Sequence, residues 1–304
     1  MSGSILEIAQ DGRHLSLFRG FLKLSEGEKE IARIPLDAIS AVLVNCYQAS
    51  VSQNIMLACA EAGIPIVLCG TNHQPKATLL PVEGHHKQAG NLQAQLNASK
   101  PLAKQLWKQL IQAKITGQHH VLEKALKAKA SRLLEMANSV KSGDPDNVEA
   151  HAARYYWKAL MGNDFVRNQE AGGSNAMLNY GYTVLHATVA RAVVASGLHP
   201  SLGVHHQNRL NAFCLVSDVM EPYRPVVDYA VFNLLQNNHL EITSEVKKQL
   251  VEIMQWPVIV NGENTTISNG ILYTTQSLVK SFIADTAELY FPEIKSYSFF
   301  LAKN

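Results

Sequence analysis

Cysteine is scarce in this chain of 304 residues, and the few cysteines are not paired in sequence. Cys46, Cys59, Cys69 and Cys214 form no Cys-x-x-Cys motif, the spacing that common structural zinc sites use. Disulfide frameworks belong to small secreted domains, and this chain is much longer than those. We therefore expect neither structural zinc nor disulfides, and three of the four cysteines stand in apolar surroundings typical of small core residues.

Long apolar runs are also lacking. No run approaches the roughly 18 apolar residues that a membrane-spanning helix needs. The first residues, MSGSILEIAQDGRHL, lack the basic start, apolar middle and cleavage site of a secretory signal. With 47% hydrophobic and 17% charged residues, the composition is that of a folded protein with a sizeable core and room for two domains. We expect a cytoplasmic protein with no membrane partner.

The net charge is only +2, but the charge is unevenly distributed. Residues 100–132 carry seven lysines and one arginine against a single acid, Glu123, so this segment is net +7 and the remainder is −5. Lys100, Lys104 and Lys108 recur every four residues, which places three ammonium groups on one helical face. Such a face is commonly only solvated, but a concentration of this size also indicates a surface for a nucleic-acid backbone.

The first 82 residues are patterned as short strands. Segments rich in β-forming residues are separated by Gly, Asp or Pro: ILEIAQ, HLSLFRG, FLKLSEG, EIARIPL, AVLVN, PIVLC and ATLLPV. One helix is predicted from about Ser50 to Ala62, with Gly63 following its end. This pattern predicts a β-rich domain over residues 1–82. Because it holds no cluster of acids and histidines, we interpret it as a scaffold or dimerisation surface.

From residue 83 the character changes. Residues 83–100 are polar and weakly patterned, as in a linker. Over residues 101–304 apolar positions recur at helical spacing. Breaks are expected at Gly117, 142–145, 171–174 and 199–203, with a short hairpin in WPVIVNGENTTIS before a final helix. The predicted fold class is α+β, a small N-terminal β-rich domain followed by a larger all-helical catalytic domain.

Imidazoles and carboxylates stand close together in SLGVHHQNRLNAFCLVSDVMEPYRP, residues 201–225. Acidic side chains are almost never fully buried unless another group pairs with them, so these carboxylates need a partner. A straight helix from His206 to Glu221 would rise about 22 Å, far more than the distance between two ligands of one metal. The chain must therefore turn between them, and two intervening asparagines tolerate a turn. We predict His206 on or near a loop, with Asp218 and Glu221 on one face of the following helix.

A third candidate, Glu149, lies in DPDNVEAHAARYYW. Asp144 and Pro145 suit a helix start, which places Glu149 in the first turns. Asp146-x-x-Glu149 is also a possible capping box, which would explain the glutamate without catalysis. Spacing alone leaves both interpretations open.

The histidine pair has alternatives as well. His205 and His206 suit loop residues that hydrogen-bond to backbone carbonyls. With Asn208 they faintly resemble an HNH-type nuclease, but that fold needs a ββα unit around its metal, and residues 212–220 are patterned as a helix.

The run SLGVHHQNRLNAFCLVSDVMEPYRPVVD follows EAHAARYYW and GSNAMLNYGYTVLHATVARAVVASGLHP. Together they closely resemble the CRISPR-associated integrase of spacer acquisition, most of all the version found in type II systems. The match runs from about Asp144 to Asp228 with its motifs in order. The β-rich part fits the family in architecture, but its motifs are weak.

The resemblance maps the metal-binding Glu–His–acid set of that family onto Glu149, His206 and Glu221. The family pattern His-x-Asn selects His206, which has an asparagine two residues on, and His205 is the fallback. Asp218 falls on another acidic position of the motif, as a second ligand or as an acid that supports the ligands.

Members of this family are metal-dependent DNA endonucleases and integrases. They insert short DNA duplexes, the spacers, into a CRISPR repeat array by attack of 3′-hydroxyls on phosphodiesters. Negative charge develops on phosphate oxygens, where a divalent cation stabilises it. Hard oxygen ligands suit Mg²⁺ or Mn²⁺, and one imidazole favours Mn²⁺.

The resemblance also implies partners. Two joinings need two active sites at a fixed distance, which the family provides with two homodimers bridged by a dimer of a small CRISPR-associated adaptation partner, a 4:2 complex. The double-stranded DNA of spacer and repeat array would be held mainly by its phosphates, a task that suits Lys100, Lys104 and Lys108.

Two other functions remain open. A non-catalytic DNA-binding subunit of the same fold is disfavoured by the intact Glu149, His206 and Glu221. A structure-specific DNA repair nuclease is not distinguished by sequence, because cutting and joining use the same metal site.

Overall fold

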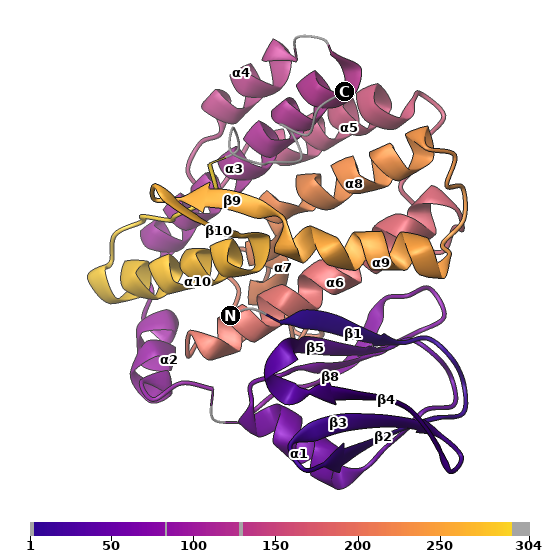
Figure 1. The fold of residues 1–304 in the computed structure, drawn as a ribbon. Helices are drawn as coiled ribbons and strands as arrows, with labels where there is room; N and C mark the ends of the chain where they lie inside the picture. Colours follow the sequence, from indigo (N-terminus) through magenta and orange to yellow (C-terminus); the bar gives the residue numbers. More distant parts are fainter. Residues whose placement is uncertain (1–2, 83, 128–129, 294–304) are drawn as a thin grey trace.

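The N-terminal strands form two sheets in the computed structural model, which describes residues 3–82, 84–127 and 130–293 (Figure 1). One sheet has the order β1-β5-β7-β8, with β1 (Ser4–Ile8), β5 (Ile39–Val44), β7 (Ile66–Cys69) and β8 (Pro75–Leu79). The other has the order β4-β3-β2-β6, with β2 (Arg13–Phe18), β3 (Phe21–Glu26), β4 (Lys29–Pro35) and β6 (Ser50–Val51). The predicted strands are confirmed, but the helix predicted from about Ser50 begins at Gln53, because Ser50 and Val51 pair with β2 as the short strand β6.

Strand β5 joins two cores. Val42 and Val44 pack into the core of the β-rich part, which also includes Ile55 from α1 (Gln53–Glu61). Ala41 and Leu43 belong to the core of the helical part. Because successive side chains of a strand point to opposite faces, a strand covered on both faces is apolar throughout. The β-rich part is therefore packed directly onto the helices.

The rest of the chain is mostly helical, and the predicted α+β class is confirmed (Figure 1). The helices are α2 (Gln88–Leu96), α3 (Lys100–Leu126), α4 (Ser131–Ser139), α5 (Val148–Met161), α6 (Ser174–Ala195), α7 (Cys214–Met220), α8 (Arg224–Gln236), α9 (Ser244–Glu252) and α10 (Ile267–Ala284). The short 3₁₀ turns within the described residues are η1 (Leu36–Ala38), η2 (Glu221–Tyr223) and η3 (Ile253–Gln255). The predicted hairpin is present as β9 (Pro257–Val260) and β10 (Glu263–Thr266).

Helix α6 lies at the centre of the helical part. It contacts β5 on one side and α7, α8, α9 and α10 on others. A helix that is surrounded in this way is apolar on most of its circumference, and the stretch from Met177 to Val194 is largely buried. The central helix thereby links the β-rich part to the elements that form the site described below.

Two details differ from the sequence prediction. The break expected at Gly117 was wrong, because α3 continues through it. A Cβ at Gly117 would lie 3.1 Å from Cγ of Pro225, so the glycine permits close packing against α8. The segment predicted as a linker contains α2, whose buried Asn91 and Gln95 hydrogen-bond to the carbonyls of Ser196 and Leu202. The polar residues of this segment therefore fix α2 against the end of α6 and the loop that follows it.

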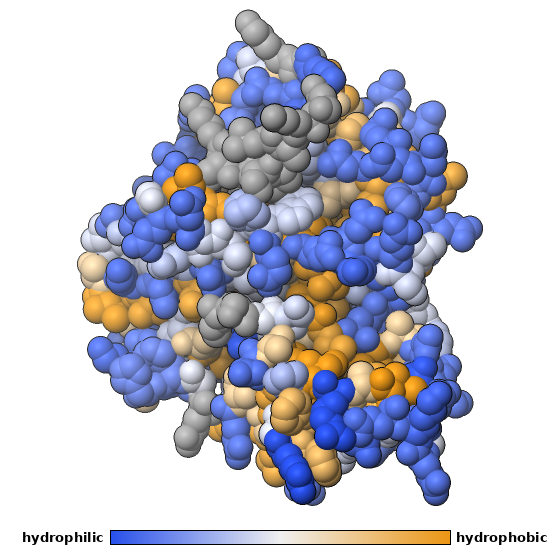
Figure 2. All heavy atoms as spheres, in the orientation of Figure 1, coloured by the Kyte–Doolittle hydropathy of each residue, from blue (hydrophilic) through white to orange (hydrophobic). Residues whose placement is uncertain are grey.

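Polar side chains cover much of the helical part on the face in Figure 2, and hydrophobic ones gather over the β-rich part. Exposed apolar residues of the β-rich part include Leu17, Phe18, Phe21, Ile31, Tyr47, Leu57, Leu68, Leu79 and Val82. Within the described ranges, none of the helices is long and apolar enough to cross a membrane.

Candidate active site

Three segments that are distant in the chain meet at one buried lysine. Lys114 on α3 is 7% exposed. Its ammonium forms an ion pair with Glu149 on α5, and its Nζ lies 2.5 Å from Oε2 of Glu221 on η2. The two predicted carboxylates therefore converge on one cation, although 72 residues separate them in the chain.

The start of α5 leaves the Glu149 side chain available for this contact. The carboxylate of Asp144 accepts the backbone N–H groups of Val148 at 2.9 Å and Glu149 at 3.0 Å, and so caps the helix. Asp146 instead pairs with Lys141 at 2.7 Å. The capping box between Asp146 and Glu149 is therefore absent, and that interpretation of the glutamate was wrong.

Glu221 is a buried anion between two cations. Nε of Arg224 donates to its Oε1 at 2.8 Å. Burial alone would raise the pKa of Glu221, but the charges of Arg224 and Lys114 lower it to about 2. Oε2 is buried and faces the Lys114 ammonium, so both oxygens of this carboxylate are met by side-chain cations and neither by a backbone N–H group.

His206 lies in the loop before α7, as predicted, and Asp218 on α7 holds that loop. Asp218 is fully buried, and its Oδ2 accepts the backbone N–H groups of Val204 at 2.6 Å and His205 at 2.9 Å. Its Oδ1 accepts the Nδ1–H of His206. This hydrogen bond raises the pKa of His206, although burial opposes the shift. The ring is oriented from its Nδ1 side, which leaves Nε2 as the other coordinating atom.

His205 occupies a different environment from its neighbour. Its ring stacks on Trp107 with 4.1 Å between ring centroids and an interplanar angle of 5°. Trp107 is buried, as predicted for a core residue. His205 therefore packs against α3 and shapes the loop that carries His206.

Two hollows flank this arrangement. A cleft of about 620 Å³ is lined by Lys114, Glu149, Glu221 and Arg224. A second, of about 480 Å³, is lined by Lys100, His206 and Arg209 among others. Asn211 lines both. The carboxylates and the histidine thus face adjoining hollows rather than one.

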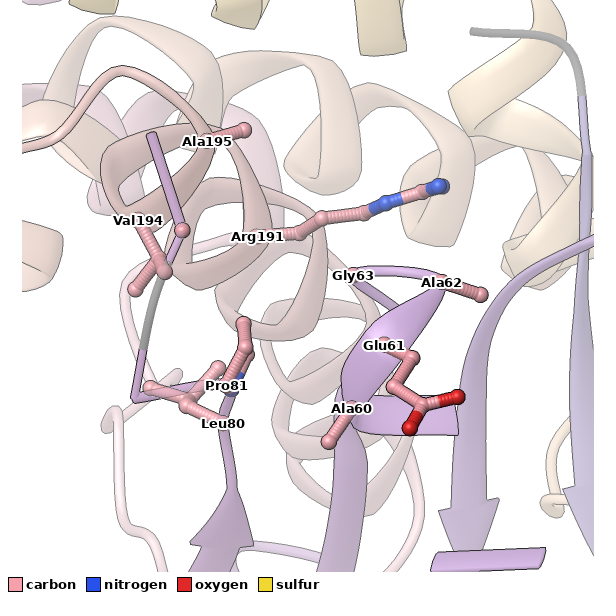
Figure 3. Close-up of a pocket in the computed structure, with 10 residues that line it drawn as sticks. Ala60, Glu61, Ala62, Gly63, Leu80, Pro81, Arg191, Val194 and Ala195 are labelled. Atoms are coloured by element: carbon pink, nitrogen blue, oxygen red, sulfur yellow. The ribbon is translucent and has the colours of Figure 1, made fainter. Parts of the chain in front are cut away.

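A third hollow lies outside the site. Figure 3 shows a pocket of about 230 Å³ between the end of α1, the segment after β8 and α6. Arg191 extends across it from α6, and the Glu61 carboxylate points away from that guanidinium. None of the predicted site residues lines this pocket.

The donor groups of the two hollows fit a divalent cation in part. Two carboxylates that share one cation and an oriented imidazole are suitable ligand types for Mg²⁺ or Mn²⁺. Their ligand atoms are not all within 4.8 Å of one another, however. Over the described parts of the chain that spacing is met by His119, His120 and Glu123 on α3.

The cations of the site, Lys114 and Arg224, are functional residues that no sequence motif marks. In the sequence, Lys114 is one of the lysines of a basic segment. The four-residue spacing of Lys100, Lys104 and Lys108 does not continue to position 114, and the neighbours Ile111 and Ile115 are apolar. That departure was the available signal. Arg224 follows Glu221 by three residues, and residues at this spacing are neighbours on a helix, so the sequence could have indicated their ion pair.

The three DNA-binding candidates lie along the first turns of α3. Lys100 and Lys104 are exposed, and Lys108 is half-buried. Lys100 lines the same hollow as His206. Of the basic segment, Lys129 lies outside the described residues.

The chain is similar to proteins of a known family over most of its length. The family model described as CRISPR associated protein Cas1 matches residues 6–253. The CRISPR-associated endonuclease Cas1 of Neisseria meningitidis serogroup C (strain 8013) is 34% identical over 295 residues, which cover 94% of this chain and 95% of the relative.

Two solved structures share the fold. A casposase bound to integration product aligns with a TM-score of 0.80 and 20% identity over 94% of this chain and 92% of that one. A chain of a Cas6-RT-Cas1–Cas2 complex aligns with a TM-score of 0.76 and 16% identity over 94% of this chain and 36% of that one.

Proposed function

Because the chain belongs to the Cas1 family of CRISPR-associated proteins, we propose that it is a DNA endonuclease and integrase that inserts spacer duplexes into a CRISPR repeat array. The observation that carries the proposal is the convergence of Glu149 and Glu221 on one buried cation, beside the oriented ring of His206. The family match and the 34% identical endonuclease support the same activity.

Glu149, Glu221 and His206 would hold Mg²⁺ or Mn²⁺. The metal supplies a Lewis acid for the phosphate oxygens on which charge develops. Asp218 accepts the Nδ1–H of His206 and so keeps Nε2 directed away from Asp218. Arg224 keeps Glu221 ionised, since its charge lowers the pKa of that carboxyl.

The reaction is a transesterification at phosphorus. A 3′-hydroxyl of the spacer attacks a phosphodiester of the repeat, a new P–O bond forms, and the 3′-oxygen of the cut strand leaves with a proton. Cutting without joining uses water in place of the hydroxyl. Ser217, Asn211 and Arg167 also line the main cleft and offer polar groups to a DNA backbone.

Duplex DNA would run along the exposed turns of α3. Lys100, Lys104 and Arg209 present positive charge beside the hollow that His206 lines. Such contacts to phosphates give affinity without base specificity.

The β-rich part carries exposed apolar side chains that suit a homodimer interface. Its exposed Leu17, Phe18, Phe21 and Ile31 lie on β2, β3 and β4, and apolar side chains in one sheet favour burial against a partner. We assign the homodimer interface to this sheet. We further propose a small CRISPR-associated adaptation partner, a 4:2 complex and a cytoplasmic location. The structural neighbour in a Cas6-RT-Cas1–Cas2 complex supports the partner alone.

An integration assay tests this function. The protein, its small partner, a repeat-containing plasmid and a short duplex with 3′-hydroxyl ends are incubated with Mn²⁺ or with EDTA. We expect joined products with Mn²⁺ only, and none from a duplex with 3′-dideoxy ends. Cleavage of branched DNA without joining would favour the repair-nuclease alternative. Binding without either reaction would favour a non-catalytic subunit.

A further inference from the structure

Lys114 differs from every other lysine of the basic segment that the structure describes. It is the one buried lysine among the described residues, whereas Lys100 and Lys104 are exposed. A lysine ammonium is strongly hydrated, and burial costs much of that hydration. Burial by itself lowers the pKa of Lys114, but the charges of Glu221 and Glu149 raise it above the ordinary value. The lysine is therefore a buried cation that the two carboxylates hold.

The charges of this cluster balance without any bound ion. Glu149 and Glu221 contribute two negative charges, and Lys114 and Arg224 contribute two positive ones. Arg224 approaches Glu221 from the η2–α8 side, three residues along the chain. Lys114 alone contacts both carboxylates among the described residues. Its ammonium lies where a cation shared by the two carboxylates would lie.

An ammonium and a divalent cation cannot occupy this place together. At separations near 4 Å, like charges repel strongly where water is largely excluded. The lysine stem has four rotatable methylene groups, and Lys114 lines the main cleft of about 620 Å³. The ammonium therefore has a path out of the carboxylate pair without a change in the helix that carries it.

We propose that Lys114 takes the place of the divalent cation in the metal-free protein, and that metal binding displaces its ammonium into the cleft. The inference rests on the proposed metal site at Glu149 and Glu221. In the metal-free state the lysine keeps two buried carboxylates close together. In the loaded state the same ammonium is directed at the cleft, where the DNA phosphate is an available anion. Lys114 is thus a positioning residue that also sets metal affinity.

The first test is Mn²⁺ binding in the absence of DNA, measured by titration calorimetry. All proteins carry H119A, so that the group His119, His120 and Glu123 does not contribute a second site. K114M removes the competing charge and keeps the length of the stem. We expect Mn²⁺ to bind K114M at least about fivefold more tightly, the lower end of usual coupling between two sites. Lys108→Met on the same helix is the matched control and should leave the affinity unchanged.

The second measurement is thermal unfolding without metal. K114M leaves two carboxylates without their shared cation, so its Tm should fall by roughly 5 °C. Saturating Mn²⁺ should restore it. K114R keeps a cation between the carboxylates, so it should retain the metal-free Tm and bind Mn²⁺ no more tightly than the wild-type lysine does. If K114M does not fold, K114R and K114Q carry the same comparison.

The outcomes separate this inference from the proposed function. Equal or weaker Mn²⁺ binding by folded K114M, with binding abolished by E149Q and E221Q, overturns the role of Lys114 and leaves the metal site intact. Absence of Mn²⁺ binding in every variant overturns the proposed site itself. Tighter binding by K114M, lost on addition of E221Q, supports displacement.

Discussion

Asp218 and Glu221 are three residues apart and both are buried, yet they are held in different ways. Among the described residues, every hydrogen bond to the Asp218 carboxylate comes from residues 204–206, three from backbone N–H groups and one from the His206 ring. Glu221 is held by the side chains of Lys114 and Arg224. Backbone donors cannot leave without refolding the loop, whereas side-chain cations can exchange. The half of the site around Asp218 is therefore built to be rigid, and the half around Glu221 is able to accept another cation.

This contrast bears on the role that the sequence left open for Asp218. A carboxylate has about four acceptor positions, and the loop donates four hydrogen bonds to the Asp218 carboxylate. We infer that Asp218 orients His206 and is not itself a metal ligand. Glu221 contacts only side-chain cations through its two oxygens, and because these can exchange it retains the capacity to bind a metal.

The largest expected loss of strand joining comes from changes in the half of the site around Glu221. E221Q keeps the shape of the side chain but removes the charge, and strand joining should fall by roughly 10³-fold or more. E149Q should have a comparable effect. The integration assay gives the rate, and circular dichroism at the assay temperature shows whether the fold persists. Retention of full activity by folded E221Q would remove Glu221 from the site.

A smaller loss of strand joining is expected from a change in the half of the site around Asp218. D218N replaces one acceptor oxygen by an amide that faces backbone N–H donors, so the loop and the His206 ring lose their orientation. Joining should fall by about 10–100-fold, the usual effect of a residue that supports a metal ligand. Because both changes act through the histidine, D218N should add little to the loss of Mn²⁺ affinity that H206A causes. Multiplicative losses of Mn²⁺ affinity in the double variant would contradict an orienting role.

The lysines at the start of α3 differ from the buried Lys114 on the same helix, because they are available to DNA phosphates. If Lys100, Lys104 and Lys108 contact phosphates, each lost contact reduces the slope of log affinity against log salt by about 0.9. Changing all three to glutamine should weaken binding to unrelated duplexes alike and reduce the slope by roughly 2–3. Filter binding at several salt concentrations measures the slope. An unchanged slope in the folded triple variant would return these lysines to a solvated face.

Asp228 is a third buried acid, and neutral hydroxyls surround it. Tyr182 donates to it, and burial raises its pKa from 3.8 to about 7 in spite of the hydroxyls of Tyr182 and Tyr156. Between those values the folded protein keeps a proton that the unfolded chain has lost. The free energy of unfolding should therefore fall as pH rises from about 4 to about 7. D228N should flatten this dependence in urea unfolding at pH 5 and 7.5, and an unaltered pH profile would show that Asp228 is ionised throughout.

The smallest effect is expected at His205, which stacks on Trp107 and has no contact with Asp218 through its ring. H205A should cost about 0.5–1.5 kcal/mol of stability from the lost aromatic pair, and joining should change severalfold at most. H206A in the same assay should be inactive. An inactive H205A with an active H206A would transfer the ligand role to His205.

Much of the fold was predictable because its signals are local. The strands β2, β3 and β4 pair with sequence neighbours, as does the hairpin of β9 and β10, so alternation and turn residues sufficed. The family resemblance is confirmed, and its narrower type II version stays a prediction. The error at Gly117 has a non-local cause, since the neighbour that favours glycine there is Pro225 on another helix.

The sequence by itself determined most of the elements and the family, and its motifs predict Glu149, His206 and Glu221 as site residues. Only the tertiary structure decided which charges meet. Lys114 and Glu221 are 107 residues apart, and no local pattern relates them. A lysine in a basic segment is solvated or buried according to what packs over its helix, because desolvation of a charge is tolerated only where opposite charges from other elements arrive. Here α5 and η2 bring those charges to α3.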